Sequence, residues 1–170
     1  RLRPAHPEQC LAQHDARMVL GDVRELVTAG GIADHVDLRV GRAQTAVADD
    51  ATLVERNARG VVTLTLNRPQ QFNALSEEMM GALQAELDAV ARDDAARVVV
   101  IAARGKAFCP GHDLKQMKAN PSVDYYRALF AQCAKLMLTI QRMPQPVIAR
   151  VHGIATAAGC QLVAMCDLAV

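Results

Sequence analysis

The sequence predicts an α/β fold, in which strands alternate with amphipathic helices. Three short apolar runs, at 61–66, 97–102 and 146–151, have the length and composition of strands. Between them lie two longer segments whose apolar residues recur at helical spacing. The alternation of strands and helices indicates connections of the βαβ type.

The first elements after position 50 are predicted to form a hairpin. Residues 53–56 and 61–66 are the two strands, and they flank the turn Asn57-Ala-Arg-Gly60. In the second strand the aliphatic residues at even positions share one face and the two threonines share the other. This pattern is typical of a strand with one buried face.

Two helices are predicted from start signals and apolar spacing. Ser76 is suited to cap the first helix, and Glu77 and Glu78 are favourable in its first turn. The second helix is expected to end before Pro144. The apolar stripe of the first helix is Met80, Leu83, Leu87 and Val90, and that of the second is Tyr126, Leu129, Phe130, Cys133, Met137 and Ile140.

The remaining strands follow from uninterrupted apolar runs. Residues 97–102 have the continuous pattern of a strand that is buried on both sides. Residues 146–151 form another predicted strand, and one more is expected to begin within 166–170.

Residues 1–50 differ from the rest and are predicted to be an unassigned N-terminal extension, so that the domain covers 51–170. They contain no aromatic residue, no lysine and eight acidic residues, and the acidic residues argue against a transit peptide. Within them, 17–28 is predicted to be a helix that ends at Gly30-Gly31.

The composition argues against several functional classes. A formal net charge of +1 and 3% aromatic residues give no basis for binding nucleic acid or an anionic membrane. No apolar run approaches the roughly 18 residues of a membrane span. The five cysteines form no C-x-x-C pair, which favours a reducing compartment and argues against a zinc or other metal site. The bacterial-like composition predicts a cytoplasmic location, or a mitochondrial one if the source is eukaryotic.

Two turns, at 106–115 and 152–161, are the segments most indicative of chemistry. Each follows a strand-like run and could open a helix, and two facing turns can direct backbone N–H groups at one oxygen. In the first turn Gly111 would let the N–H of His112 face outward, and Asp113 could hold the turn by accepting N–H bonds. The alternative is an ordinary strand-to-helix turn, in which the His112 imidazole is a bystander or, less favoured, a general base.

The second turn is built from small residues, which allow a ligand or another backbone to approach closely. The alternative is tight packing of a helix start on a strand. Cys109 and Cys160 lie in these turns and are predicted to be buried structural thiols, because no base is available to activate them. Lys106 and Lys115 could meet phosphates, although each is also typical of a solvated surface lysine.

Residues 52–170 together resemble the enoyl-CoA hydratase/isomerase family, the crotonase superfamily. That family has a crotonase-like spiral of ββα turns and assembles as trimers or hexamers. Its C-terminal helices and second catalytic carboxylate would follow Val170, so the resemblance implies the N-terminal part of the domain. The matching segments are Leu64-Thr-Leu-Asn-Arg-Pro69, Asn73-Ala-Leu75, Val98–Ala102, Lys106-Ala-Phe108, Gly111-His-Asp-Leu-Lys115, Pro146-Val-Ile-Ala149, His152-Gly153, Ala158-Gly-Cys-Gln-Leu162 and Cys166-Asp167.

The resemblance implies an acyl-CoA thioester as ligand, with coenzyme A as part of the substrate and no other cofactor. The N–H groups of His112 and Ala158 would form an oxyanion hole that stabilises a thioester enolate. The residues implied to contact the substrate or its CoA portion are Phe72, Ala74, Lys106, Ala107, His112, Asp113, Leu114, Lys115 and Ala158.

Gln161 departs from the family pattern, since hydratases carry an acid/base Glu at this position. A neutral amide has no titratable proton, which argues against ordinary hydratase activity. The resemblance therefore predicts a lyase or isomerase of fatty-acid metabolism that relies on another carboxylate. Two alternatives remain: a non-catalytic acyl-CoA binder or regulatory homologue, and a truncated product without function.

Overall fold

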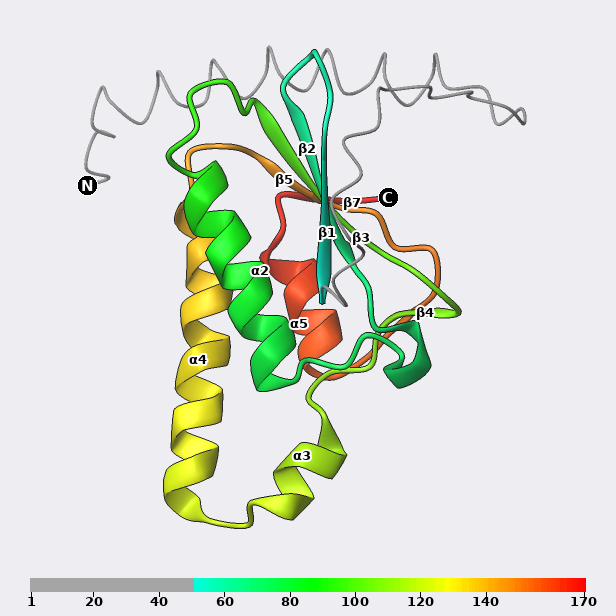
Figure 1. The fold of residues 1–170 in the computed structure, drawn as a ribbon, viewed down its shortest axis with the longest axis vertical. Helices are drawn as coiled ribbons and strands as arrows, with labels where there is room; N and C mark the ends of the chain where they lie inside the picture. The colour runs from blue at the N-terminus through cyan, green and yellow to red at the C-terminus, as the bar shows by residue number, and fades with distance from the viewer. Residues whose placement is uncertain (1–50) are drawn as a thin grey trace, which may run out of the picture. The chain divides into compact units, whose positions relative to one another are not determined.

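The computed structural model describes residues 51–170, and Figure 1 shows their arrangement. The extension 1–50 and its predicted helix at 17–28 lie outside the described residues. The helix and the boundary between extension and domain therefore stay predictions.

A five-stranded sheet forms the centre of the described chain, in the order β1-β2-β3-β5-β7. The first pair is an antiparallel hairpin, and every other neighbouring pair is parallel. The α/β prediction and the hairpin are thus confirmed. The strands are β1 (Thr52–Arg56), β2 (Val61–Leu66), β3 (Val98–Ala103), β5 (Val147–Ala149) and β7 (Leu168–Ala169).

The strand ends differ slightly from the predicted ones. The runs 146–151 and 166–170 contribute only three and two residues to the sheet, as β5 and β7. In β2 the aliphatic side chains at even positions are buried, as the alternation predicted. Their burial against the helices places the core on one face of the hairpin.

Two long helices, α2 (Glu77–Val90) and α4 (Val123–Arg142), pack beside each other on one side of this sheet (Figure 1). Helix α2 packs against β1 and β2, and α4 packs against α2 and α5 (Ala158–Met165). The first, α2, begins at Ser76, whose hydroxyl accepts the N–H of Met79 at 3.1 Å. The second, α4, is tied to α2 by the Gln84 amide, which donates to the Thr139 hydroxyl at 2.9 Å.

Two members of the predicted α4 stripe are not in the core, and one of them, Tyr126, is half-buried. Phe130 is 48% exposed, because its ring lies at the margin of the α4 stripe and contacts the His112 ring. Leu136 takes a core position that the predicted stripe did not include.

Both indicative turns open helices, as expected, and a second small sheet joins them. Strands β4 (Ala107–Cys109) and β6 (Ile154–Ala155) pair in parallel. The helices that follow are α3 (Leu114–Ala119) and α5 (Ala158–Met165), and a 3-10 turn, η1 (Pro69–Gln71), precedes the loop that faces them. None of the helices described between residues 51 and 170 is long and apolar enough to cross a membrane.

Candidate functional site

Three loop segments converge at the ends of β2, β4 and β6. Asn73 joins two of them and is completely buried. Its side-chain oxygen accepts the N–H of Arg68 at 2.9 Å, and its amide donates to the carbonyls of Arg104 at 2.8 Å and Ala107 at 3.0 Å. The loop at 72–74 is thereby fixed against the segment that carries Lys106.

The next residue along, Leu75, contacts the first turn. Its N–H donates to the Gly111 carbonyl at 2.8 Å, and its carbonyl accepts the N–H of Asp113 at 3.4 Å. The His112 N–H, between these two bonds, has no acceptor among residues 51–170. Asp113 caps α3, as anticipated, by accepting the N–H groups of Lys115 at 2.8 Å and Gln116 at 3.2 Å.

The second turn lies directly against the first at Gly111. This glycine has φ +101°, and a Cβ there would stand 3.0 Å from the Ala157 Cβ and 3.1 Å from the Ala158 nitrogen. Position 111 therefore requires glycine, because its φ is unfavourable for other residues and because a side chain would crowd the second turn. It also follows that the nitrogens of His112 and Ala158 belong to adjoining peptides.

Ala158 is the first residue of α5, and its N–H has no acceptor in the described part of the chain. The N–H groups in the first turn of a helix lack partners within the helix, and the helix dipole makes them attractive to negative charge. Ala157, the capping residue, has φ 48° and ψ −125°. A non-glycine residue in this region is strained, and such strain concentrates at functional sites.

Close packing explains one of the small residues in the second turn. A side chain at Gly159 would overlap the Cys109 carbonyl oxygen of β4. The tight-packing alternative therefore holds for Gly159, while Ala157 is exposed and Ala158 only half-buried. The unpaired N–H of Ala158 therefore lies beside a residue that is accessible from outside.

The His112 imidazole packs edge-on against Phe130 of α4, with the ring centroids 5.3 Å apart. Burial lowers the pKa of this imidazole, and the nearby backbone of Leu75 partly opposes the shift. Its Nδ1 is buried without a hydrogen-bond partner. These surroundings favour the neutral form of the imidazole, and among residues 51–170 no carboxylate contacts it.

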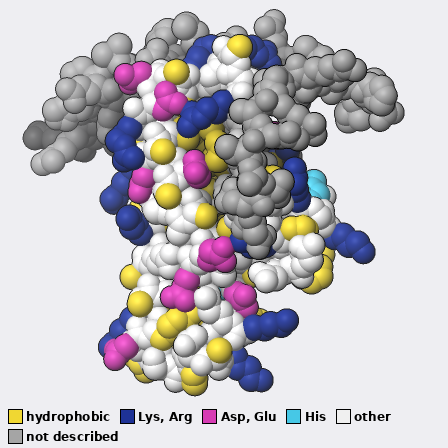
Figure 2. Space-filling model, viewed as in Figure 1, with side chains coloured by type: hydrophobic (Ala, Val, Ile, Leu, Met, Phe, Trp, Pro, Cys, Tyr) yellow, Lys and Arg dark blue, Asp and Glu magenta, His cyan; other side chains and the backbone are white. Residues whose placement is uncertain are grey.

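The other residues implied by the family resemblance surround the two turns and differ in exposure. Phe72 is 54% and Leu114 74% exposed, and Lys106 and Lys115 are exposed as well. Ala107 is buried in β4, where its carbonyl accepts from Asn73. Ala74 and Asp113 are half-buried. On the face seen in Figure 2, basic and acidic side chains are interspersed and form no single charged patch.

The two cysteines of the turns differ, and the prediction that both are buried is wrong for one of them. Cys109 is buried in β4, and burial raises the pKa of its thiol to about 11. Cys160 is exposed, because it falls on the outer side of the short helix α5 while Gly159 and Leu162 face inward.

Gln161 lies one turn into α5 and is exposed. Its backbone N–H donates to the Ala157 carbonyl at 3.0 Å, so the residue helps to close the first turn of the helix. Its side chain makes no hydrogen bond within residues 51–170. In the same part of the chain, no group of three or more His, Cys, Asp or Glu residues could hold a metal ion.

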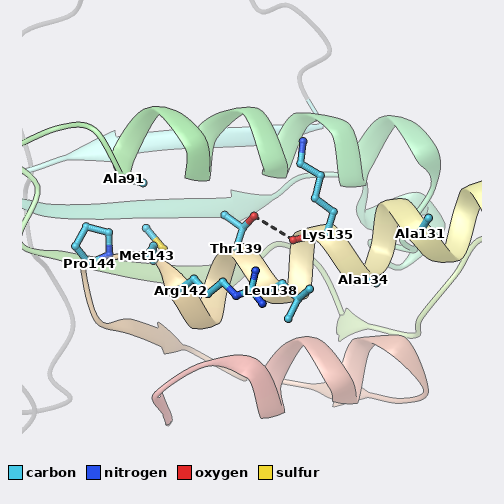
Figure 3. Close-up of a pocket in the computed structure, with 9 residues that line it drawn as sticks. All are labelled: Ala91, Ala131, Ala134, Lys135, Leu138, Thr139, Arg142, Met143 and Pro144. Atoms are coloured by element: carbon cyan, nitrogen blue, oxygen red, sulfur yellow. Dashed lines mark hydrogen bonds between the residues drawn. The ribbon is translucent and has the colours of Figure 1, made fainter. Parts of the chain in front are cut away.

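An open apolar groove of about 610 Å³ lies elsewhere, along α4 and the end of α2 (Figure 3). None of the predicted site residues lines it. Its walls are Ala91, Ala131, Ala134, Lys135, Leu138, Thr139, Arg142, Met143 and Pro144. The convergence of loops at Gly111 and Ala158, and not this groove, therefore remains the candidate site.

Sequence reasoning missed three residues that shape the site. Asn73 and Leu75 belong to a motif that resembles the family, but no local pattern indicates their structural role, and only the fold shows that their partners lie at 104, 107 and 111. Ala157 carries no signal for its left-handed backbone, since glycine is the residue that usually indicates one.

Comparison with known proteins gives a consistent result. The family model described as enoyl-CoA hydratase/isomerase matches residues 56–170. A crystal structure of an enoyl-CoA hydratase from Mycobacterium smegmatis is 67% identical, with a TM-score of 0.69 over 70% of this chain and 46% of that one. The enoyl-CoA hydratase domain-containing protein 3 of Xenopus laevis, named as mitochondrial, is 49% identical over 69% of this chain and 40% of its own length.

The crystal structure of human enoyl-CoA hydratase domain-containing protein 3 is 41% identical, with a TM-score of 0.66 over 70% of this chain and 47% of that one. The chain thus spans about half, or less, of the length of these relatives. Two motifs of the chain, Gly111-His-Asp-Leu-Lys115 and Ala155-Thr-Ala-Ala-Gly-Cys-Gln-Leu-Val163, are similar to this branch of the family, and the relatives confirm that similarity.

Proposed function

Because the chain belongs to the enoyl-CoA hydratase/isomerase family, we propose that the protein binds an acyl-CoA thioester and stabilises its enolate with the N–H groups of His112 and Ala158. One observation carries the proposal. The two N–H groups belong to adjoining peptides, and neither has an acceptor among residues 51–170. A thioester oxygen between them would satisfy both.

The chemistry follows from where the charge develops. When the proton on the carbon next to the thioester is removed, negative charge moves onto the carbonyl oxygen. Donors that are already oriented stabilise this charge without reorganising, and removal of one such donor typically costs about 3–4 kcal/mol. The start of α5 adds the positive end of a helix dipole at the same place.

The CoA portion would extend over the surrounding loops. The proposed contacts are Phe72 and Ala74 in one loop, Lys106 and Ala107 in the second, and His112–Lys115 at the start of α3. Asn73 holds the first two loops together through its bonds to Arg104 and Ala107. No metal or further cofactor takes part in the proposal.

Gln161 limits the reaction that can be proposed. Its amide cannot give or take a proton, and general acid–base catalysis typically contributes about 10²–10⁴-fold. The Asp113 carboxylate already caps α3. We therefore propose a lyase or isomerase that uses a carboxylate outside residues 51–170. The second candidate, favoured by Gln161, is an acyl-CoA binder without turnover.

The metabolic role, the oligomeric state and the cellular location are proposed from the family. A role in fatty-acid metabolism, assembly as a trimer or hexamer, and a cytoplasmic location in a bacterium are the expectations. The relative from Mycobacterium smegmatis supports the bacterial setting, whereas the curated vertebrate relatives are named as mitochondrial.

Titration of the full-length protein with crotonyl-CoA tests the proposal. Binding heat and the absorbance of the conjugated thioester are followed together. Binding with turnover supports the enzyme, binding without turnover supports the second candidate, and no binding contradicts both. His112→Pro, which removes one donor, should abolish turnover or weaken binding of the thioester.

Val123→Pro is the matched control for this substitution. Position 123 is the first residue of α4, is 64% exposed, and follows Ser122, whose φ of −129° and ψ of 149° suit a residue before proline. This variant should bind and react as the wild type does.

A further inference from the structure

Thr156 makes hydrogen bonds to both turns of the candidate site. Its N–H donates to the Cys109 carbonyl at 3.1 Å, and its hydroxyl donates to the Pro110 carbonyl at 3.0 Å. Its own carbonyl accepts the N–H groups of Gly159 at 2.8 Å and Cys160 at 3.2 Å, in the first turn of α5. Thr156 therefore bonds to the segment just before His112 and to the segment just after Ala158, the two residues whose N–H groups are unpaired.

The side chain of Thr156 supplies a second bond to the first turn, which its backbone cannot make. Any residue except proline could supply the N–H bond to Cys109. Holding Pro110 requires a donor in the side chain as well, here the hydroxyl, and the Pro110 carbonyl belongs to the peptide that enters Gly111. Because glycine permits many conformations, the peptide after Gly111 depends on its neighbours for its orientation. The branched side chain of threonine has few rotamers, so the hydroxyl is itself well placed.

We propose that Thr156 is a positioning residue that fixes the His112 N–H relative to the Ala158 N–H. This inference rests on the proposed function, in which both groups bind the thioester oxygen. Thr156 does not contact that oxygen in the proposal. Its hydroxyl acts through Pro110 and Gly111, and its carbonyl acts through the start of α5.

Loss of the Thr156 hydroxyl should weaken recognition of the thioester carbonyl oxygen and should hardly change the free energy of unfolding. Thr156 is exposed, and the loss of an exposed hydrogen bond changes stability little. A donor that is no longer aligned with its acceptor, by contrast, weakens steeply with angle. A purely structural role would change folding without changing the preference for a ligand that has the oxygen.

The test compares two ligands in the full-length protein. Butyryl-CoA is a thioester, and S-butyl-CoA is the thioether that lacks the carbonyl oxygen. The ratio of their dissociation constants measures recognition of that oxygen. Thr156→Val keeps the shape and removes the hydroxyl, and we expect it to reduce the ratio about three- to ten-fold, the worth of a typical hydrogen bond. Thr156→Ser keeps the hydroxyl and should stay within about two-fold of wild type.

Thr139→Val provides a matched control on α4. Like Thr156→Val, this substitution deletes a hydroxyl that donates to a carbonyl, here the Lys135 carbonyl at 3.0 Å. Thr139 lies outside the candidate site. The substitution should lower stability, because Gln84 loses a partner, and leave the ligand ratio unchanged.

The outcomes separate the inference from the function on which it rests. A wild-type preference for the thioester that Thr156→Val retains would overturn the inference and leave the proposed function standing. An equal loss in the valine and serine variants would also overturn it, since the hydroxyl would then not be the cause. If the wild type binds neither ligand, or binds both equally, the proposed function fails and the inference fails with it.

Discussion

The Leu75 N–H donates to the Gly111 carbonyl at 2.8 Å and thereby sets the side to which the His112 N–H points, while Thr156 holds the peptide before Gly111. Every peptide in the described chain is trans. In a trans peptide the C=O and N–H groups point to opposite sides. A donor that holds the carbonyl from one side therefore turns the N–H of the same peptide to the other side, away from Leu75.

Gly111→Ala should damage both stability and ligand binding. Its φ of +101° is unfavourable for alanine, and the new Cβ would stand 3.0 Å from the Ala157 Cβ. We expect the free energy of unfolding to fall by about 1–3 kcal/mol, as for other strained backbone positions. Denaturant unfolding and titration with butyryl-CoA measure the two effects.

Gly81→Ala is the matched control within α2. There the new Cβ would meet only the Gln132 side chain, at 3.8 Å. Alanine is the better helix former, so stability should rise by about 0.5–1 kcal/mol without change in binding. If Gly111→Ala were as harmless as Gly81→Ala, the close approach of the two turns would be wrong.

Asn73→Ala should be strongly destabilising. It removes three bonds of a fully buried side chain: those to the carbonyls of Arg104 and Ala107 and to the N–H of Arg68, of which the bond to Ala107 is itself buried. Unsatisfied buried groups cost about 1–3 kcal/mol each, so a loss of about 2–4 kcal/mol in the free energy of unfolding is expected. Thermal and denaturant unfolding of the full-length protein measure it.

Asn120→Ala serves as the comparison for this substitution. The Asn120 amide donates to the Gln116 carbonyl at 3.1 Å on the exposed end of α3. Removal of an exposed bond of this kind should change stability by less than about 0.5 kcal/mol. Equal effects of the two alanine variants would contradict the role given to Asn73.

The elements that the sequence predicts are those with enough length to display a period. The β1–β2 hairpin has alternating burial in β2, and α2 has four buried residues at helical spacing after a serine cap. Strands β4 and β6 contain only three and two residues, too few for any period. They form because the two turns face each other, which is a property of the whole chain.

The candidate site shows the same division. The turns and the capping role of Asp113 could be predicted, because small residues and an aspartate before a helix are local signals. The bonds from Asn73 and Leu75 join segments far apart in sequence and have no local signal. The exposure of Cys160 depends on which side of the short helix α5 packs against β4, and eight residues do not show this.

The half-buried His112 should make stability depend on pH. Burial lowers the pKa of its imidazole below the ordinary value of 6.5, so the unfolded chain binds the proton more tightly than the folded chain. The contribution of His112 to the free energy of unfolding is therefore fully present above about pH 6.5. It is lost as the pH is lowered toward the folded pKa, with a slope of at most about 1.4 kcal/mol per pH unit.

His112→Gln removes this titration. The free energy of unfolding, measured between about pH 7.5 and about pH 5, should fall less steeply with acid in the variant than in the wild type. The difference between the two slopes isolates His112 from the other groups of the chain. Parallel curves would mean that the imidazole is as accessible to protons in the folded state as in the unfolded one.

The cysteines of the described chain should differ sharply in reactivity. The thiolate is the reactive form, and burial raises the pKa of Cys109 to about 11, so only about one thiol in 10⁴ is ionised at neutral pH. Burial likewise raises the pKa of Cys133, and it raises that of Cys166 to about 12. Cys160 is exposed on α5. Iodoacetamide should therefore modify Cys160 before the other three.

Peptide mapping by mass spectrometry after brief labelling of the native protein measures this order. Cys160→Ser should remove the early adduct within residues 51–170, whereas labelling in denaturant should reach all four of these thiols. Because Cys160 directly follows the glycine that packs on Cys109, early modification of Cys109 would show that α5 separates from β4 in solution. The adjoining arrangement of Gly111 and Ala158, which depends on that packing, would then be wrong as well.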